Sequence, residues 1–204
     1  MKSPVRALLV ACVLLSPLVL INCGGDSTQV SRTDTNAVRD LSGDWNATDS
    51  QEAADDLSHQ VTNQSWVSDF QAKYGRKPSV KVGRVYNRTQ EDITISILTD
   101  DIRRSLLNTG KVTIVASNED TDQARDERKD QDVNASADTR HESFAETGAD
   151  FLLEGKITTQ NDQQDNRKQK FYDIEMNLTD VKTQELVWEG DHKIAKDVVQ
   201  KNYN

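Results

Sequence analysis

Hydrophobic side chains recur every three to five residues in two parts of the chain's first half, which is the spacing of an amphipathic helix. The first part lies between residues 48 and 74 and predicts one or two helices, ended by Gly75. The second lies between residues 92 and 108 and predicts one helix, closed by Gly110. The apolar positions are Leu57, Val61, Trp66, Val67 and Phe70 in the first part and Ile95, Leu98, Ile102 and Leu106 in the second.

Short β-rich runs predict strands on either side of the second helix and in the last third of the chain. The expected strands are residues 79–86, 111–115, 151–158, 171–180 and 186–194. In the fourth of them, Tyr172, Ile174, Met176 and Leu178 alternate with polar residues and should share one face. Residues 160–170 are polar, and we interpret them as an excursion outside the sheet.

The order of these elements predicts an α/β or α+β domain. Strand, helix and strand in succession suggest a parallel βαβ unit, and the last three strands should be antiparallel. We expect a small mixed sheet of about four to five strands, with helices packed on one side. Two polar stretches are less regular: residues 118–137 predict a solvated helix or a mobile excursion, and residues 138–145 a short helix ended by Gly148.

The first 22 residues have the pattern of a signal peptide that ends at Cys23. Lys2 and Arg6 precede a 15-residue apolar run at positions 7–21, which is shorter than the ~20 residues of a membrane span. Residues 20–23 form a lipobox-like sequence, although Asn22 replaces the usual small residue. We therefore predict lipidation of Cys23; an ordinary secretory signal that leaves a free thiol and an uncleaved anchor are the alternatives.

The leader divides the chain into three expected parts. Residues 1–22 are the signal peptide, residues 23–44 the lipidated cysteine with a flexible tether, and residues 45–204 one globular domain. The tether is rich in Gly, Ser, Thr, Asp and Asn and contains no proline. The two or more acyl chains of a modified Cys23 would hold the domain on a membrane.

Composition excludes several classes of function. The chain carries a net charge of −9, which disfavours binding to nucleic acid. Apart from Cys12 in the leader and Cys23 there is no cysteine, so thiol chemistry in the domain is excluded. The histidines His59, His141 and His192 have no partners at the spacing of metal ligands, and no nucleotide-binding or nucleophile motif occurs. We expect neither an enzyme nor a cofactor or metal.

Asn87, Arg88 and Thr89 lie directly after the first expected strand and form the candidate binding motif. In a loop at this position, the Asn and Thr side chains can satisfy backbone groups while Arg88 is presented to a partner. The alternative is that the three residues serve the turn alone.

Several short segments together resemble the LpoB family of lipoproteins that activate penicillin-binding proteins. They are residues 44–46, 85–89, 109–112, 139–140, 147–155 and 186–188. The resemblance implies a fold similar to the N-terminal domain of TolB, and an outer-membrane lipoprotein on the periplasmic face. It also implies a regulator of peptidoglycan synthesis that binds and activates a class A penicillin-binding protein.

The tether departs from what the resemblance implies. The best-known members have a long, proline-rich tether, whereas the tether here is short. A periplasmic adaptor of an envelope assembly or export system, similar to TolB-N or CsgG, is the alternative function, because it also needs an anchored α/β domain. In either case we expect a monomer, with Asn87, Arg88 and Thr89 as candidate partner-binding residues.

Overall fold

A computed structural model describes residues 31, 32, 34, 42–134 and 148–199 of the chain. The chain divides into two compact units, residues 1–35 and 36–204, and every helix and strand described belongs to the second. The predicted signal peptide, Cys23 and the helix expected at residues 138–145 lie outside the described residues.

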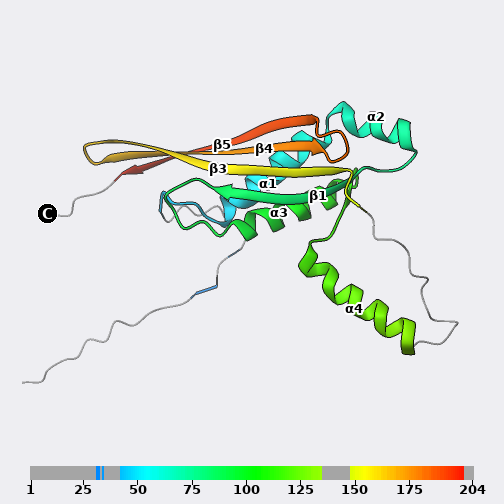
Figure 1. Ribbon diagram of the computed structural model, residues 1–204. Coiled ribbons are helices and arrows are strands. Elements are labelled where there is room, and N and C mark those ends of the chain that lie inside the picture. The colour runs from blue at the N-terminus through cyan, green and yellow to red at the C-terminus, as the bar shows by residue number, and fades with distance from the viewer. Residues whose placement is uncertain (1–30, 33, 35–41, 135–147, 200–204) are drawn as a thin grey trace, which may run out of the picture. The chain divides into compact units, whose positions relative to one another are not determined.

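Four helices are described, and they largely follow the hydrophobic pattern (Figure 1). They are α1 (Ala47–Thr62), α2 (Ser65–Tyr74), α3 (Ile95–Thr109) and α4 (Asn118–Asn134). The first region thus contains two helices, and α4 is the solvated helix that was one of two alternatives. None of the helices described is long and apolar enough to cross a membrane.

Three helix ends are closed by residues typical of caps. Asn46 caps α1, because its side chain accepts the N–H groups of Thr48 and Asp49 while Asp49 bonds back to the Asn46 N–H. Gly75 and Gly110 end α2 and α3 with φ of 67° and 66°. Helix α3 begins at Ile95, three residues later than the predicted start at residue 92, because the preceding loop bonds to itself and to the sheet.

The described residues form one five-stranded mixed sheet. Its strands are β1 (Ser79–Asn87), β2 (Thr113–Ile114), β3 (Phe151–Gln164), β4 (Arg167–Asp180) and β5 (Leu186–Val199). They lie in the order β2-β1-β3-β4-β5. β1 pairs in parallel with β2 and β3, whereas β3–β4 and β4–β5 are antiparallel. The predicted α+β architecture is confirmed, although β2 is much shorter than expected.

The interpretation of residues 160–170 as an excursion outside the sheet is wrong. β3 and β4 remain paired from the pair of Phe151 with Asp180 to the pair of Gln164 with Arg167. β5 stays paired with β4 as far as Val199. A tight turn at Asp165, with φ of 54°, reverses the chain. Backbone pairing does not require apolar side chains, and most of these polar residues are exposed, while Lys170 at the inner end is buried.

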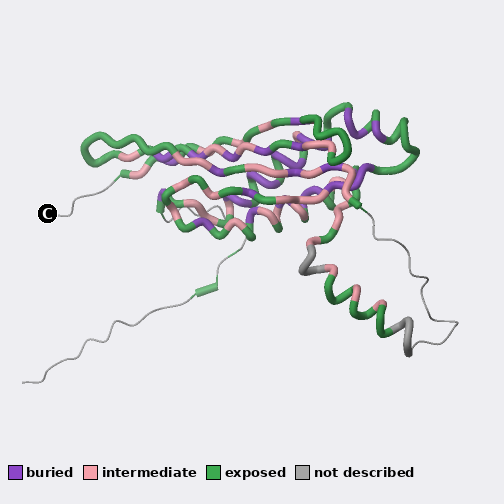
Figure 2. The backbone as a smooth tube through the Cα atoms, viewed as in Figure 1, coloured by how far each residue is buried: buried purple, intermediate pink, exposed green. Residues whose placement is uncertain are grey.

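The core lies between one face of the sheet and helices α1 and α3 (Figure 1). Alternate residues of β4, from Tyr172 to Leu178, are almost fully buried there, as the sequence predicted. Trp188 and Ile194 of β5 also share this face, one buried and one packed at its margin. In Figure 2 the buried positions gather along the inner part of β3, β4 and β5, while the turn between β3 and β4 is exposed.

A bulge in β1 determines which side chains face the core near its end. Val82 pairs with Leu153 and Val85 with Gly155, so Gly83 and Arg84 together oppose a single residue of β3. The bulge buries Val85 and leaves Tyr86 exposed, on the face of the sheet away from the core.

Candidate functional surface

The 87–91 loop continues directly from β1. Asn87 is the last residue of the strand and pairs with Ile157 of β3. The Arg88 N–H then donates to the Ile157 carbonyl over 2.8 Å. The loop is therefore attached to the sheet for one residue beyond the strand before the chain proceeds to α3.

The side chains of Asn87 and Thr89 hold the loop in shape. Asn87 Oδ1 accepts the Thr89 N–H over 2.9 Å and the Thr89 hydroxyl over 2.7 Å. Asn87 Nδ2 donates to the Glu91 carbonyl over 2.8 Å, and the Glu91 N–H donates to Thr89 Oγ1 over 3.1 Å. These two polar side chains thus satisfy the loop backbone, as the sequence suggested.

Arg88 is the exposed member of the predicted trio. Its guanidinium carbon lies 5.3 Å from the centre of the Tyr86 ring, at the distance of a cation–π contact. Tyr86 itself keeps 46% of its surface accessible. A cation and an aromatic ring, the side chains most enriched at the energetic centres of protein interfaces, are therefore presented together.

A row of side chains extends this surface across the open face of the sheet. Tyr86 pairs with Lys156, Lys156 with Glu175, and Glu175 with Asp191. Lys156 and Glu175 form an ion pair of 3.0 Å. Arg88 and Tyr86 border a shallow hollow of about 270 Å³ that continues over this row. Its mixed charges suit a polar protein surface better than a small apolar ligand.

Glu91 is the residue of this region that sequence reasoning missed. Its carboxylate accepts the Trp45 N–H over 3.1 Å, the Lys170 ammonium over 2.7 Å and the Tyr172 hydroxyl over 2.8 Å. Burial alone would raise the pKa of Glu91, but the bonds from Lys170, Trp45 and Tyr172 outweigh it and lower the pKa. Glu91 is therefore ionised and fully engaged on the core side of the loop.

Residues 42–46, which we call the N-terminal segment, pack on the same cluster. Asp44 forms an ion pair with Lys170, and the Tyr172 hydroxyl lies 3.0 Å from the Gly43 carbonyl. The Trp45 and Tyr172 rings meet edge to face at 5.5 Å. Burial lowers the pKa of Lys170, but Asp44 and Glu91 together raise it above its ordinary value. The Lys170 ammonium thus binds the N-terminal segment and the 87–91 loop at once.

A second buried lysine lies beside Lys170. Lys196 of β5 is its register partner and donates to Asp49 of α1 over 2.6 Å. Both lysines continue the core-facing row of Tyr172 and Ile194. The alternation of faces along both strands is visible in the sequence and could have indicated that the two lysines face the core. Nothing in the sequence indicated which carboxylates they bind.

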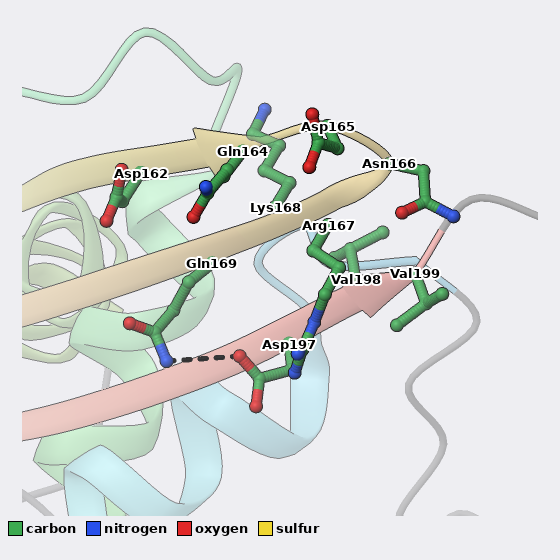
Figure 3. A pocket seen from close by; sticks show the side chains of 10 residues that line it. All are labelled: Asp162, Gln164, Asp165, Asn166, Arg167, Lys168, Gln169, Asp197, Val198 and Val199. Carbon is green, nitrogen blue, oxygen red and sulfur yellow. Dashed lines mark hydrogen bonds between the residues drawn. The ribbon is translucent and has the colours of Figure 1, made fainter.

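A larger hollow of about 420 Å³ lies at the turn between β3 and β4 (Figure 3). Exposed amide and charged side chains line most of it, and Gln169 donates to Asp197 over 3.0 Å. Besides the amides, the lining side chains are carboxylates, cations and two valines. We regard it as the solvated end of the hairpin.

No cluster of three metal-ligating side chains occurs among the residues that the structure describes. His192 instead contacts Asp56 of α1 over 2.7 Å, and Gln60 of α1 donates to the Asp191 carbonyl over 3.0 Å. These contacts attach β5 to α1.

Solved structures similar to this chain include two LpoB C-terminal domains. The one from Salmonella enterica is 21% identical, with 72% of this chain and 98% of that chain covered and a TM-score of 0.40. The one from Escherichia coli is 20% identical, with 72% and 99% covered and a TM-score of 0.39. Lipoprotein GNA1162 from Neisseria meningitidis is 16% identical, with 61% and 87% covered and a TM-score of 0.38.

Curated proteins give no match to this chain. The family described as "Peptidoglycan-synthase activator LpoB", in contrast, matches residues 49–194. This range runs from the first turn of α1 to Ile194 of β5 and includes the 87–91 loop. The chain therefore belongs to the LpoB family of peptidoglycan-synthase activators.

Proposed function

We propose that this protein is a membrane-anchored lipoprotein that binds and activates a class A penicillin-binding protein. Membership of a family described as synthase activators carries this proposal, because the match covers residues 49–194. The protein's part is regulatory: it acts by binding, and the synthase performs the polymerisation and cross-linking.

We further propose that Arg88 and Tyr86 lie at the centre of the synthase-binding surface. Both side chains are exposed and in contact with each other, and the loop that presents Arg88 is held by its own hydrogen bonds. A pre-ordered side chain loses less conformational entropy on binding than a mobile one. Asn87 and Thr89 contribute by shaping the loop rather than through free polar groups.

Substitution of Arg88 tests this surface. We expect Arg88→Ala to weaken binding to a purified class A synthase by about tenfold, which is the loss expected for a moderate interface hot spot. Stimulation of glycan polymerisation should fall in parallel at subsaturating protein. Binding is measured by surface plasmon resonance with the full-length chain in detergent, and polymerisation with a lipid-linked precursor.

Arg84→Ala is the matched control, because Arg84 is an exposed arginine of β1, the strand that leads into the loop. It should leave the affinity within about twofold of the unsubstituted protein, as expected for a residue outside the contact. Equal losses of affinity from both substitutions would show that the effect comes from the overall charge of the protein and not from a contact of Arg88. If the unsubstituted protein neither binds nor stimulates any cognate synthase, the activator function itself is wrong.

The membrane anchor is proposed from the sequence of the leader. Residues 1–22 would be removed, Cys23 acylated, and the domain joined to the outer membrane through residues 23–44. Labelling of cells with radioactive palmitate should mark the protein, and Cys23→Ala should abolish the label and release the protein from the membrane fraction. Retention of the label in Cys23→Ala would place the modification elsewhere.

Cross-linking in intact cells separates the activator from an envelope adaptor. Capture of a penicillin-binding protein supports the proposal, whereas capture of Tol-Pal or curli-type export components would favour the adaptor. The same experiment tests whether a tether of this length reaches an inner-membrane synthase.

A further inference from the structure

The 87–91 loop and the N-terminal segment are joined through one residue. The Glu91 backbone bonds to Asn87 and Thr89 within the loop. Its carboxylate bonds to Trp45 of the N-terminal segment and to Lys170 of β4. An unbroken series of hydrogen bonds, with distances between 2.7 and 3.1 Å, thus runs from the loop to the place where the chain enters the domain.

Lys170 holds this series together electrostatically. It leaves only 8% of its side chain exposed and binds two carboxylates, those of Asp44 and Glu91. Without its charge the two carboxylates would face each other, and like charges in a partly buried site repel. Either the N-terminal segment would leave the sheet or Glu91 would move. Movement of Glu91 would displace the loop backbone to which the Asn87 and Thr89 side chains are bonded.

We propose that Glu91 is a positioning residue for the 87–91 loop, and that Arg88 is presented to its partner only while residues 42–46 are seated on Lys170. The partner of Arg88 is the synthase of the proposed function, so the claim about Arg88 rests on that function. The ordering of the loop is a separate claim about this chain alone. The membrane tether would thereby join the domain at a point coupled to its docking loop.

The chain provides a matched pair of variants for the test. Lys170 and Lys196 are register partners on neighbouring strands, with 8% and 7% of their side chains exposed, and each ammonium forms an ion pair. Both lysines contact the N-terminal segment, Lys170 through the Asp44 carboxylate and Lys196 through the Asp44 carbonyl over 3.2 Å. Lys170 also contacts Glu91, whereas the carboxylate paired with Lys196 is that of Asp49 in α1. Lys170→Met and Lys196→Met therefore remove equivalent charges, but only the first charge is bonded to Glu91 in the contacts described.

The experiment compares amide hydrogen exchange and synthase affinity in the full-length protein. In Lys170→Met we expect the Thr89 and Glu91 amides, both bonded within the loop, to exchange about tenfold faster, since the ordered loop is less populated. Synthase affinity should fall in proportion to the fraction of molecules that keep the loop ordered, about tenfold where one molecule in ten does, because only the ordered fraction binds. Lys196→Met should leave loop exchange and synthase affinity within about twofold of the unsubstituted protein, even where it lowers the melting temperature as much as Lys170→Met does.

Glu91→Gln is a second variant that preserves the size of the side chain. It should also speed exchange of the Thr89 amide, because a neutral amide cannot replace the carboxylate between Lys170 and the Trp45 N–H. Loop exchange unchanged in both Lys170→Met and Glu91→Gln, or accelerated equally in Lys196→Met, would overturn the inference. If no variant, nor the unsubstituted protein, binds a synthase, the proposed function fails while the exchange data still decide whether Glu91 positions the loop.

Discussion

The three long strands have two parts that are held in different ways. In the inner part, from Asp180 to Tyr172 of β4 and the rows paired with it, alternate side chains are buried under α1 and α3. In the outer part, from Phe171 to Arg167, the backbone pairing is just as regular, yet most side chains are polar and exposed. Pairing thus determines how far a strand extends, whereas burial determines how much of it contributes to the core.

The largest effect is expected from a cavity in the inner part. Ile174 is fully buried on β4, and Ile174→Ala should lower the free energy of unfolding by about 3 kcal/mol through lost apolar contacts and the cavity that remains. Chemical denaturation followed by circular dichroism measures this change. Gln169→Ala, on the exposed outer part of the same strand, is the control and should change it by less than about 0.5 kcal/mol. Similar losses at both positions would remove the distinction between the two parts.

A smaller effect is expected at the inner end of β3, where one carboxylate connects three segments. Asp150 accepts two bonds from Arg76, at 2.7 and 2.8 Å, and further bonds from the Ser79 hydroxyl and N–H. Asp150→Asn should therefore lower the free energy of unfolding by about 1–2 kcal/mol, the cost of charge-assisted bonds at a partly exposed site. Arg104→Ala, which breaks an ion pair on the surface of α3, should cost at most about 0.5 kcal/mol.

The contribution of Asp150 should also depend on pH with a defined sign. The Arg76 guanidinium, together with the bonds from Ser79, lowers the pKa of Asp150 from 3.8 to about 2 against the opposing effect of burial. Because the folded pKa is depressed, the stabilisation is complete above about pH 4 and is lost as the pH falls towards 2. The difference between the unsubstituted protein and Asp150→Asn should shrink over that range, and a constant difference would contradict the assignment.

The smallest effect is expected from shortening the outer part. Deletion of Gln163, Gln164, Arg167 and Lys168 removes two paired rows and keeps the Asp165–Asn166 turn. It preserves the alternation of faces, so the free energy of unfolding should change by less than about 1 kcal/mol. Deletion of Gln163 alone is the contrasting variant, because it shifts the register of one strand. If the four-residue deletion unfolds the domain, the outer part supports the core after all.

The inner part of the sheet was predictable from the sequence because its side chains repeat with a period of two. Tyr172 to Leu178 alternate, and burial follows that alternation without exception. The outer part was not predictable, because Gln160 to Lys170 show no apolar period and the backbone bonds that extend the strands leave no trace in residue type. The position of the turn depends on Asp165, whose φ of 54° is uncommon for a residue other than glycine.

The loop was predictable for a different reason. Asn87 and Thr89 bond to backbone groups two to four residues away, so their role follows from local sequence alone. Glu91, Lys170 and Asp44 are far apart in the chain, and their association depends on the fold of the whole sheet. Among 34 acidic residues, no local feature distinguishes the one that connects the loop to the N-terminal segment.

The two buried lysines also bear on how the strands align during folding. Lys170 and Lys196 occupy the row that follows Tyr172 and Ile194 on the core side. A slip of two residues along β4 or β5 would preserve the alternation of faces, so the hydrophobic pattern alone would not oppose it. Such a slip would move an ammonium group away from Asp49 or Glu91 and towards the apolar core, where an unpaired charge is strongly unfavourable. The two lysines therefore disfavour misaligned hairpins that the apolar residues would tolerate.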